Sequence, residues 1–235
     1  FYRLGEFATF LGDQGRDAII IKRLLTFENL PAIGPVTSVG QIYLGPFYYY
    51  FIAPWLLLFW FRPVGLAFGT AALSTLSIIG VYLCLKNLFN KQTALFASVF
   101  ITFSSILIEF ARFSWNPNLL PFFAFFTFYF VYRSIQKKSF LYFVLAGAFL
   151  SLSSQLHYLA LFLIPATGLS YLLYLMEKRK KIRQFLTHIF VAVGTFLLLI
   201  SPLFLFDIKH NFLNLNSFLK LINTSSTVTR NIFAE

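Results

Sequence analysis

Long apolar stretches alternate with short polar junctions over most of the sequence. Each apolar run is near the length that a helix needs to cross a bilayer, although the fourth and fifth are shorter or tightly joined. The pattern predicts an all-α integral membrane protein, a polytopic helical bundle with about six transmembrane helices between residues 63 and 206. The runs cover residues 64–85, 93–110, 119–132, 140–153, 158–176 and 185–206.

Basic residues concentrate in every second junction. Because short cytoplasmic loops are enriched in Lys and Arg, we expect the junctions after the first, third and fifth runs to face the cytoplasm. The junctions 109–118, 155–158 and 207–216 then face the opposite compartment. The cytoplasmic set is Lys86, Lys91, Arg133, Lys137, Lys138, Lys178, Arg179, Lys180, Lys181 and Arg183.

A seventh apolar run, residues 44–61, is less regular than the others. Pro46 and Pro54 interrupt it, and its Tyr, Phe and Trp content is typical of an interfacial aromatic belt. A full span here would place Asp13 and Asp17 in the cytoplasm. We therefore expect a juxtamembrane or re-entrant segment, although hydropathy alone also allows a genuine span.

The segment before this run predicts an external loop over residues 1–62. Asp13 precedes a helical pattern that ends near Phe27, so it is a candidate N-cap, and Asp13 and Asp17 share a helix face. Residues 30–45 are rich in Pro and Gly and predict an ordered or mobile loop. Residues 207–235 are expected to begin a later external loop. We interpret the chain as one transmembrane domain that is part of a longer protein.

Composition removes several classes of function. The chain is 58% hydrophobic and 11% charged, with a mean hydropathy of +0.75, unlike a soluble domain. The net charge of +11 would suggest nucleic acid in a soluble protein, but these basic residues lie in membrane junctions, so we expect no nucleic-acid partner. With Cys84 as the only cysteine, neither a disulfide framework nor a Cys-based metal site can form.

Polar motifs recur in a fixed order through the predicted external segments. They are Gly12-Asp-Gln-Gly-Arg-Asp-Ala18, Gly34-Pro-Val-Thr-Ser38, Tyr43-Leu-Gly-Pro-Phe-Tyr-Tyr-Tyr50, Arg112-Phe-Ser-Trp-Asn-Pro-Asn118, Gln155-Leu-His-Tyr158 and Phe206-Asp-Ile-Lys-His210. In this order they resemble the bacterial branch of the GT-C membrane glycosyltransferases, the group similar to dolichyl-phosphate-mannose protein mannosyltransferases and aminoarabinose transferases. The resemblance implies a juxtamembrane-helix first external loop and sugar transfer from a polyprenyl-phosphate donor at the extracytoplasmic face of the plasma membrane.

The resemblance also implies roles for individual residues. An acid in the first external loop, usually within an Asp-Glu pair, is the catalytic base of the family, and by position this is Asp13. The pair here is Asp13-Gln14, so the second acid is absent. A carboxylate suits the role because it can accept the acceptor hydroxyl's proton as the glycosyl bond forms with inversion.

A lipid-phosphate leaving group needs cationic or N–H donors. Arg112 is the first candidate, with Arg16 and His210 behind it. The remaining residues expected to bind substrate are Asp17, Trp115, Asn116 and His157.

Structural explanations compete with each role. Asp13 could be a helix cap with no catalytic role, and Asp17 could be a structural partner of an arginine. Glu109 and Arg112 could form an ion pair at i, i+3 spacing. The segment Trp115-Asn-Pro-Asn118 could be a turn that caps the next span, and His157 a hydrogen-bonded structural histidine. Asp207 and His210 could hold a divalent metal, but two ligands are too few to assign a site, so no metal-binding residue is predicted.

The sequence therefore predicts a glycosyltransferase that moves a sugar from a polyprenyl-phosphate donor to a lipid, glycan or protein acceptor. The alternative is a transporter or lipid-linked sugar flippase, whose entry vestibule the same residues would line. Mid-span positions nearly free of charge and the lack of a visible repeat favour the transferase. A transferase that uses a lipid-linked oligosaccharide instead of a single sugar also stays open.

Overall fold

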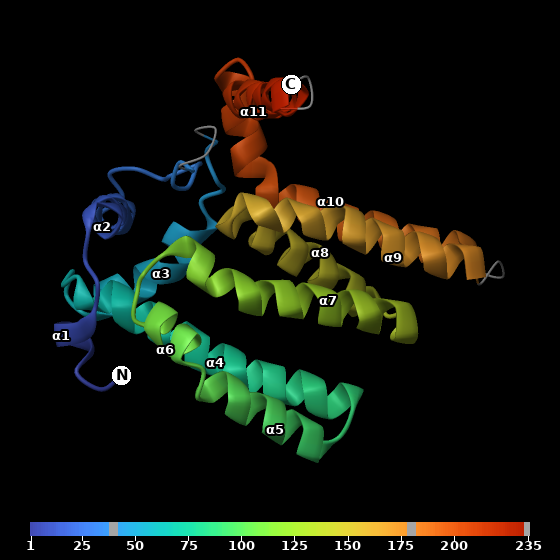
Figure 1. Ribbon diagram of the computed structural model, residues 1–235, viewed down its shortest axis with the longest axis horizontal. Helices are drawn as coiled ribbons and strands as arrows, with labels where there is room; N and C mark the ends of the chain where they lie inside the picture. The colour runs from blue at the N-terminus through green and yellow to red at the C-terminus, as the bar shows by residue number, and fades with distance from the viewer. Residues whose placement is uncertain (38–41, 178–181, 233–235) are drawn as a thin grey trace.

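The computed structural model describes residues 1–37, 42–177 and 182–232, and its regular elements in these ranges are helices (Figure 1). The all-α membrane fold is confirmed. The elements are α1 (Leu4–Phe7), α2 (Gly12–Leu25), α3 (Phe47–Leu58), α4 (Val64–Leu88), α5 (Lys91–Thr102), α6 (Ser105–Ala111), η1 (Asn116–Leu119), α7 (Leu120–Lys137), α8 (Phe140–Leu156), η2 (Tyr158–Phe162), α9 (Leu163–Glu177), α10 (Ile182–Lys209) and α11 (Leu213–Ile232).

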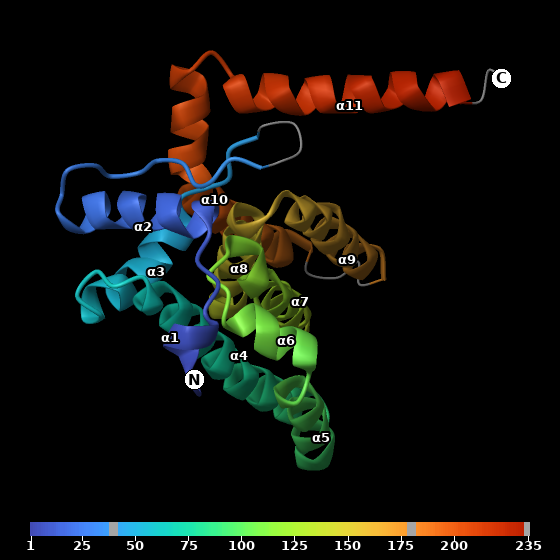
Figure 2. The ribbon, with the colours of Figure 1, turned by 60° about the vertical axis from the view of Figure 1, so that its left-hand side comes forward.

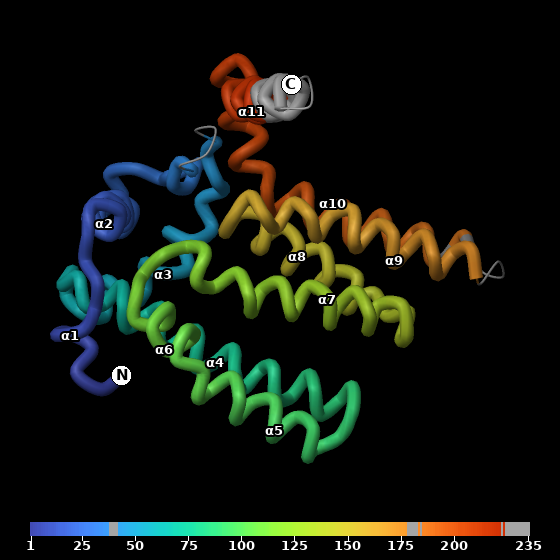
Figure 3. Tube along the Cα trace, viewed as in Figure 1, coloured from blue at the N-terminus to red at the C-terminus, as the bar shows by residue number. Residues whose placement is uncertain are grey.

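The long helices form a bundle in which α8 packs against both α7 and α10, while α4 and α5 form a hairpin beside them (Figure 3). Small residues allow the closest approach. A Cβ atom added to Gly147 of α8 would lie 2.1 Å from the carbonyl oxygen of Ala192 in α10, so only glycine fits there.

Three helices among the described residues are long and apolar enough to cross a membrane: Val64–Leu88, Tyr158–Glu177 and Phe185–Lys209. A fourth span is added if the bent pair α5 and α6 counts as one. The runs 119–132 and 140–153 are helical as α7 and α8, of which α8 is a shorter apolar helix of 17 residues. The count of six spans therefore stays a prediction.

The second apolar run was predicted to be a single span, but it forms two helices. The axes of α5 and α6 differ by 64° at a break around Phe103 and Ser104. The Ser104 hydroxyl accepts a hydrogen bond from the backbone N–H of Leu107 and so starts a new helix. Local side-chain capping thus interrupts a run that hydropathy reads as continuous.

The seventh run forms α3, which has 12 residues and Pro54 inside it. A helix of this length extends about 18 Å, whereas the hydrocarbon core is about 30 Å thick. The juxtamembrane or re-entrant location of this short helix stays a prediction.

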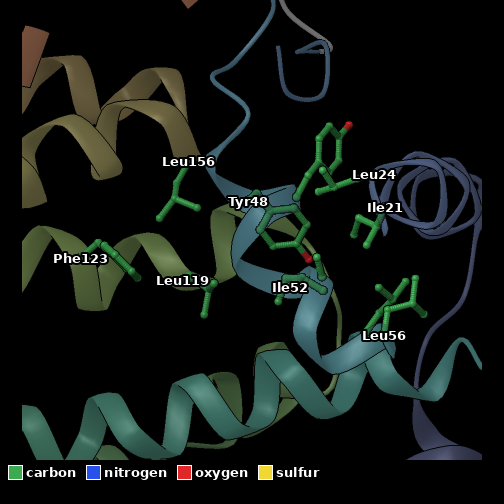
Figure 4. Close-up of a cluster of buried hydrophobic side chains, with 11 residues drawn as sticks. Ile21, Leu24, Tyr48, Ile52, Leu56, Leu119, Phe123 and Leu156 are labelled. Atoms are coloured by element: carbon green, nitrogen blue, oxygen red, sulfur yellow. The ribbon is translucent and has the colours of Figure 1, made fainter. Parts of the chain in front are cut away.

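A hydrophobic core fixes α2 and α3 on one end of the bundle. Figure 4 shows Ile21 of α2 and Ile52 of α3 facing each other, with Leu119 and Leu156 from the bundle to their left. All four side chains are fully buried. This core holds the polar face of α2 beside the η1 turn and the end of α8.

The connections between helices separate by charge. Those between α4 and α5 and between α7 and α8, which carry the basic residues, lie at the end opposite α2 and η1 (Figure 1). Their cytoplasmic location stays a prediction, and Lys178, Arg179, Lys180 and Lys181 lie outside the described residues. At the other end α11 continues from α10, which contains Pro202 (Figure 2).

The Pro- and Gly-rich loop is ordered in its described part. The backbone N–H of Gly34 donates to the Leu44 carbonyl at 2.7 Å, and that of Leu44 donates to the Pro35 carbonyl at 3.0 Å. A Cβ atom on Gly34 would lie 2.1 Å from the Gly45 carbonyl oxygen, which requires glycine. Ser38 of the predicted motif lies outside the described residues.

Candidate functional site

A cavity of about 530 Å³ opens where α2, residues 35–37 and 43–44, the η1 turn and the α8–η2 junction meet. It gathers five of the predicted site residues: Asp13, Arg16, Trp115, Asn116 and His157. They come from three segments more than 100 residues apart at the extremes. The other lining residues are Pro35, Val36, Thr37, Tyr43, Leu44, Pro117 and Tyr158.

Asp13 lies in the first turn of α2, not at its N-cap. The N-cap is Leu11, whose backbone N–H is satisfied by the Gln14 side chain at 2.9 Å, so the prediction that Asp13 caps the helix is wrong. The Asp13 carboxylate instead accepts a hydrogen bond from Nη1 of Arg16 at 2.9 Å. Its side chain is 55% exposed, which leaves it accessible to a ligand in the cavity.

The guanidinium of Arg16 is held in place by the carboxylate of Asp17. Its Nε and Nη2 both donate to Oδ1 of Asp17, at 3.0 and 2.9 Å, and the Tyr49 hydroxyl donates to the same oxygen at 3.3 Å. The Asp17 side chain is only 2% exposed and is not among the residues that line the cavity. Asp17 therefore positions Arg16, as the alternative explanation of a structural partner predicted.

Burial and neighbouring charges determine the pKa values of Asp17 and Arg16. Burial raises the pKa of Asp17 above its usual value, although the positive charge of Arg16 acts in the opposite direction. Burial lowers the pKa of Arg16, but the carboxylates of Asp17 and Asp13 outweigh it and the net change is upward. Arg16 therefore stays charged beside the cavity.

The η1 turn is built by side-chain amides. Nδ2 of Asn118 donates to the carbonyl oxygens of Phe110 and Phe113, at 3.0 and 2.7 Å, and Nδ2 of Asn116 donates to the Leu156 carbonyl. The segment is a turn, as predicted, but its Asn side chains do not cap the next helix, because neither η1 nor α7 has a side-chain N-cap hydrogen bond. The amide bonds instead tie the turn to the end of α8 and place Trp115 and Asn116 on the cavity wall.

His157 has both a structural and a cavity-facing role. Its Nδ1 accepts a hydrogen bond from the backbone N–H of Leu159 at 3.2 Å and so caps η2. Burial lowers its pKa, which keeps the ring neutral at pH 7. Because Nδ1 is the acceptor, the proton of the neutral ring is on Nε2, which can donate to a ligand.

Arg112 and His210 do not line the cavity. The guanidinium of Arg112 lies over the ring of Phe7, 5.6 Å from its centroid. Among the ion pairs of the described residues none joins Arg112 to Glu109, so that alternative is wrong. His210 stacks on Phe206 at 4.0 Å between ring centroids, and its Nδ1 lies 2.8 Å from the Phe206 carbonyl oxygen.

The carboxylate of Asp207 is hydrogen-bonded to backbone N–H groups at the start of α11. Its two carboxylate oxygens accept hydrogen bonds from the N–H groups of Asn214 and Leu215, at 2.6 and 3.3 Å. Within the described residues no three His, Cys, Asp or Glu side chains gather as a metal site would require.

A second pocket of about 220 Å³ adjoins the first and shares Tyr43, Leu44 and Tyr158 with it. Its remaining walls are mostly aliphatic and aromatic side chains of α10 and α11, including Leu203 and Phe218. A polar cavity and an apolar pocket thus meet along one wall. This arrangement suits an amphiphilic ligand.

Three amide side chains for which the sequence predicted no role hold these segments together. Gln14 donates to the Ser114 carbonyl, Gln155 donates to the Leu199 carbonyl and accepts from the Phe47 N–H, and Asn214 exchanges two hydrogen bonds with the backbone of Tyr43. Gln14 and Gln155 stand within the motifs quoted above, but nothing in the sequence distinguishes Asn214 from a surface asparagine.

A family model described as dolichyl-phosphate-mannose-protein mannosyltransferase matches residues 44–206, well over half of the chain. The matched range contains Arg112, Trp115, Asn116 and His157 and begins after α2, so it contributes nothing to the role of Asp13. No curated protein and no solved structure matches the chain.

Proposed function

The chain belongs to the dolichyl-phosphate-mannose-protein mannosyltransferase family, and we propose that it transfers a sugar from a polyprenyl-phosphate donor to an acceptor hydroxyl at the extracytoplasmic face of the plasma membrane. As a family member it is a membrane glycosyltransferase of the mannosyltransferase type. The lipid-phosphate donor, the face of the membrane and the residue roles are the proposal.

One observation carries the proposal. The cavity brings a solvent-accessible carboxylate, a charged guanidinium and a neutral imidazole together beside an apolar pocket. A polyprenyl-phosphate sugar has matching parts, because its polar sugar and negatively charged phosphate are followed by a long apolar chain. Residues that were grouped only by motif order and predicted topology thus meet in space.

Asp13 acts as the base in this mechanism. One carboxylate oxygen is held by Arg16, and the other accepts the proton of the acceptor hydroxyl while the hydroxyl oxygen attacks the anomeric carbon. The bond between that carbon and the phosphate oxygen breaks as the new glycosidic bond forms. The products are the glycosylated acceptor, with inverted configuration, and the polyprenyl phosphate.

Arg16 supplies the charge that the leaving phosphate needs. It is the basic side chain among the described residues that line the cavity, whereas Arg112 lies over Phe7. Nε2–H of His157 is a second, neutral donor for a phosphate oxygen or a sugar hydroxyl. Because Asp17 fixes the guanidinium, little reorganisation is needed when negative charge develops.

The apolar pocket accommodates the first isoprene units of the donor. It is reached from the cavity along the shared wall of Tyr43, Leu44 and Tyr158. The rest of the hydrocarbon chain then continues along the surfaces of α9 and α10, which are largely unburied within the protein. The acceptor, a lipid, a glycan or a protein, approaches from the exposed side of Asp13.

The experiment that tests this function uses the full-length protein in proteoliposomes with radiolabelled polyprenyl-phosphate sugars. The donors vary in sugar and in chain length, and protein-free liposomes are the control. Transfer of label to an acceptor, or its release by water, only with protein supports the proposal. Movement of intact labelled lipid between leaflets without consumption contradicts it and favours the flippase alternative.

A further inference from the structure

Gln14 connects the helix of the catalytic carboxylate to the opposite wall of the cavity. Its side chain is only 1% exposed, and both ends of the amide are used. Oε1 accepts from the N–H of Leu11 at 2.9 Å, while Nε2 donates to the carbonyl oxygen of Ser114 at 3.0 Å. The two residues joined by Nε2 lie 100 positions apart in the chain.

The two ends of this link are neighbours of cavity residues. Gln14 directly follows Asp13, and Ser114 directly precedes Trp115 and Asn116. The Ser114 hydroxyl also lies 2.6 Å from the hydroxyl of Tyr48 in α3, which fixes the turn from a second side. We propose that Gln14 is a positioning residue that sets the location of Asp13 relative to the Trp115–Asn116 turn. The inference rests on the proposed function, since it gives these residues a common substrate.

An amide side chain satisfies both ends of this link. The site needs an acceptor for Leu11 N–H and a donor for the Ser114 carbonyl, and an amide provides both. An ionised carboxylate provides only acceptors and would face the Ser114 carbonyl oxygen without a proton. A protonated carboxyl group again provides both. Replacement of Gln14 by Glu therefore converts the link into one that depends on pH.

The surroundings of Gln14 favour the neutral form of such an acid. Alongside Gln14 and Ser114, α4 contributes Val64, Leu66 and Ala67, all apolar. The titratable or charged groups nearby are Tyr48 of α3, whose pKa burial raises further, and Asp13, Arg16 and Asp17 on α2 itself. Burial and the two aspartates raise the pKa of a glutamic acid at this position, whereas the positive charge of Arg16 acts in the opposite direction.

The test compares Gln14→Glu with Gln14→Met and with Gln92→Glu in the full-length protein, at about pH 5.5 and about pH 8. Gln92 is exposed near the start of α5, so its replacement makes the same chemical change without the buried link. Thermal unfolding and hydrogen exchange of residues 113–118 report the link, and transfer reports its effect on catalysis. All values are taken relative to wild type at the same pH, because Asp17 and His157 also titrate.

We expect Gln14→Glu to lower kcat about tenfold at pH 8, the effect of one buried hydrogen bond left unmade, with KM for the donor nearly unchanged. Its unfolding temperature falls and exchange in 113–118 rises. The sign follows from the raised pKa in the folded state: stability is present at low pH and lost as pH rises, so Gln14→Glu recovers at pH 5.5. Gln14→Met is impaired equally at both pH values, and Gln92→Glu resembles wild type.

The proposal is overturned if Gln14→Glu resembles Gln92→Glu at pH 8, or if unfolding and exchange change while kcat does not. Failure of the proposed function is a separate result, in which wild type transfers no sugar from any donor. In that case exchange in 113–118 alone decides the link: unchanged exchange in both Gln14 variants overturns it, and increased exchange with recovery of Gln14→Glu at pH 5.5 supports it.

Discussion

Replacement of Arg16 by Met is expected to destabilise the protein by an amount that depends on pH. Met keeps an apolar stem but removes the counter-charge of Asp17, whose side chain is 2% exposed. Oδ1 of Asp17 then keeps the hydrogen bond from Tyr49, while Oδ2 already has no hydrogen-bond partner. The variant therefore leaves a buried carboxylate with little compensation.

The size of the effect follows from the burial of the two partners. Removal of one partner of a fully buried pair costs about 3–5 kcal/mol. The Arg16 side chain is 35% exposed, so solvent screens part of the interaction and the expected loss is smaller, about 2 kcal/mol. For a domain of this size that corresponds to a decrease of about 4–8 °C in Tm.

The assay is thermal unfolding in lipid nanodiscs at about pH 5.5 and about pH 8, and the sign comes from Asp17. Burial raises its pKa, and Arg16 is the main group that lowers it. Without Arg16 the pKa of Asp17 rises further, so the folded state binds a proton that the unfolded state has released, and stability is lost as pH rises. The loss in Tm is therefore larger at pH 8. In the double variant Arg16→Met with Asp17→Asn, most of the stability returns, because no buried charge remains.

An exposed pair provides the control. Arg3 and Glu6 form an ion pair whose side chains are 51% and 59% exposed, so Arg3→Met should leave Tm unchanged at both pH values. Equal losses for Arg16→Met at the two pH values, or no recovery in the double variant, would show that Arg16 does not neutralise a buried Asp17.

Two further predictions concern the cavity. Arg16→Lys keeps the charge but loses the planar fork, so it should raise KM for a lipid-phosphate donor about tenfold or more, whereas Arg112→Ala should change it less than about threefold; the reverse order in steady-state kinetics would return the phosphate role to Arg112. His157 keeps its lowered pKa through burial, so its cap on Leu159 is present above about pH 6.5 and is lost as pH falls. The wild-type rate should therefore decline at acid pH, and His157→Asn, which can still cap, should lack that decline.

Much of the fold is predictable because its signals are local. Apolar runs of helical length predict α4, α7, α8, α9 and α10, and the Pro-interrupted aromatic run predicts a short α3. The break between α5 and α6 was missed because hydropathy averages over Ser104, a single capping residue. The N-cap of α2 was assigned to Asp13, but it is Leu11, whose backbone N–H donates to the side chain of Gln14.

The site is predictable only to the level of which segments meet. Topology brings the α2, η1 and α8–η2 segments to one end, which is why Asp13, Trp115 and His157 share a cavity. Which arginine lines it depends on side-chain contacts, since Arg16 is held by Asp17 but Arg112 packs on Phe7. The contact of Arg112 with Phe7 joins residues more than 100 positions apart, and no pattern along the chain predicts it.

The role of Asp13 as the base is tested most directly by comparing wild type with Asp13→Asn in the full-length protein under single-turnover conditions, with donor binding and Tm measured in parallel. We expect Asp13→Asn to bind the donor and to unfold near the wild-type temperature but to transfer sugar slower by about 100-fold or more, the typical contribution of a general base. Transfer at the wild-type rate by the correctly folded variant would contradict the assignment of Asp13 as the base.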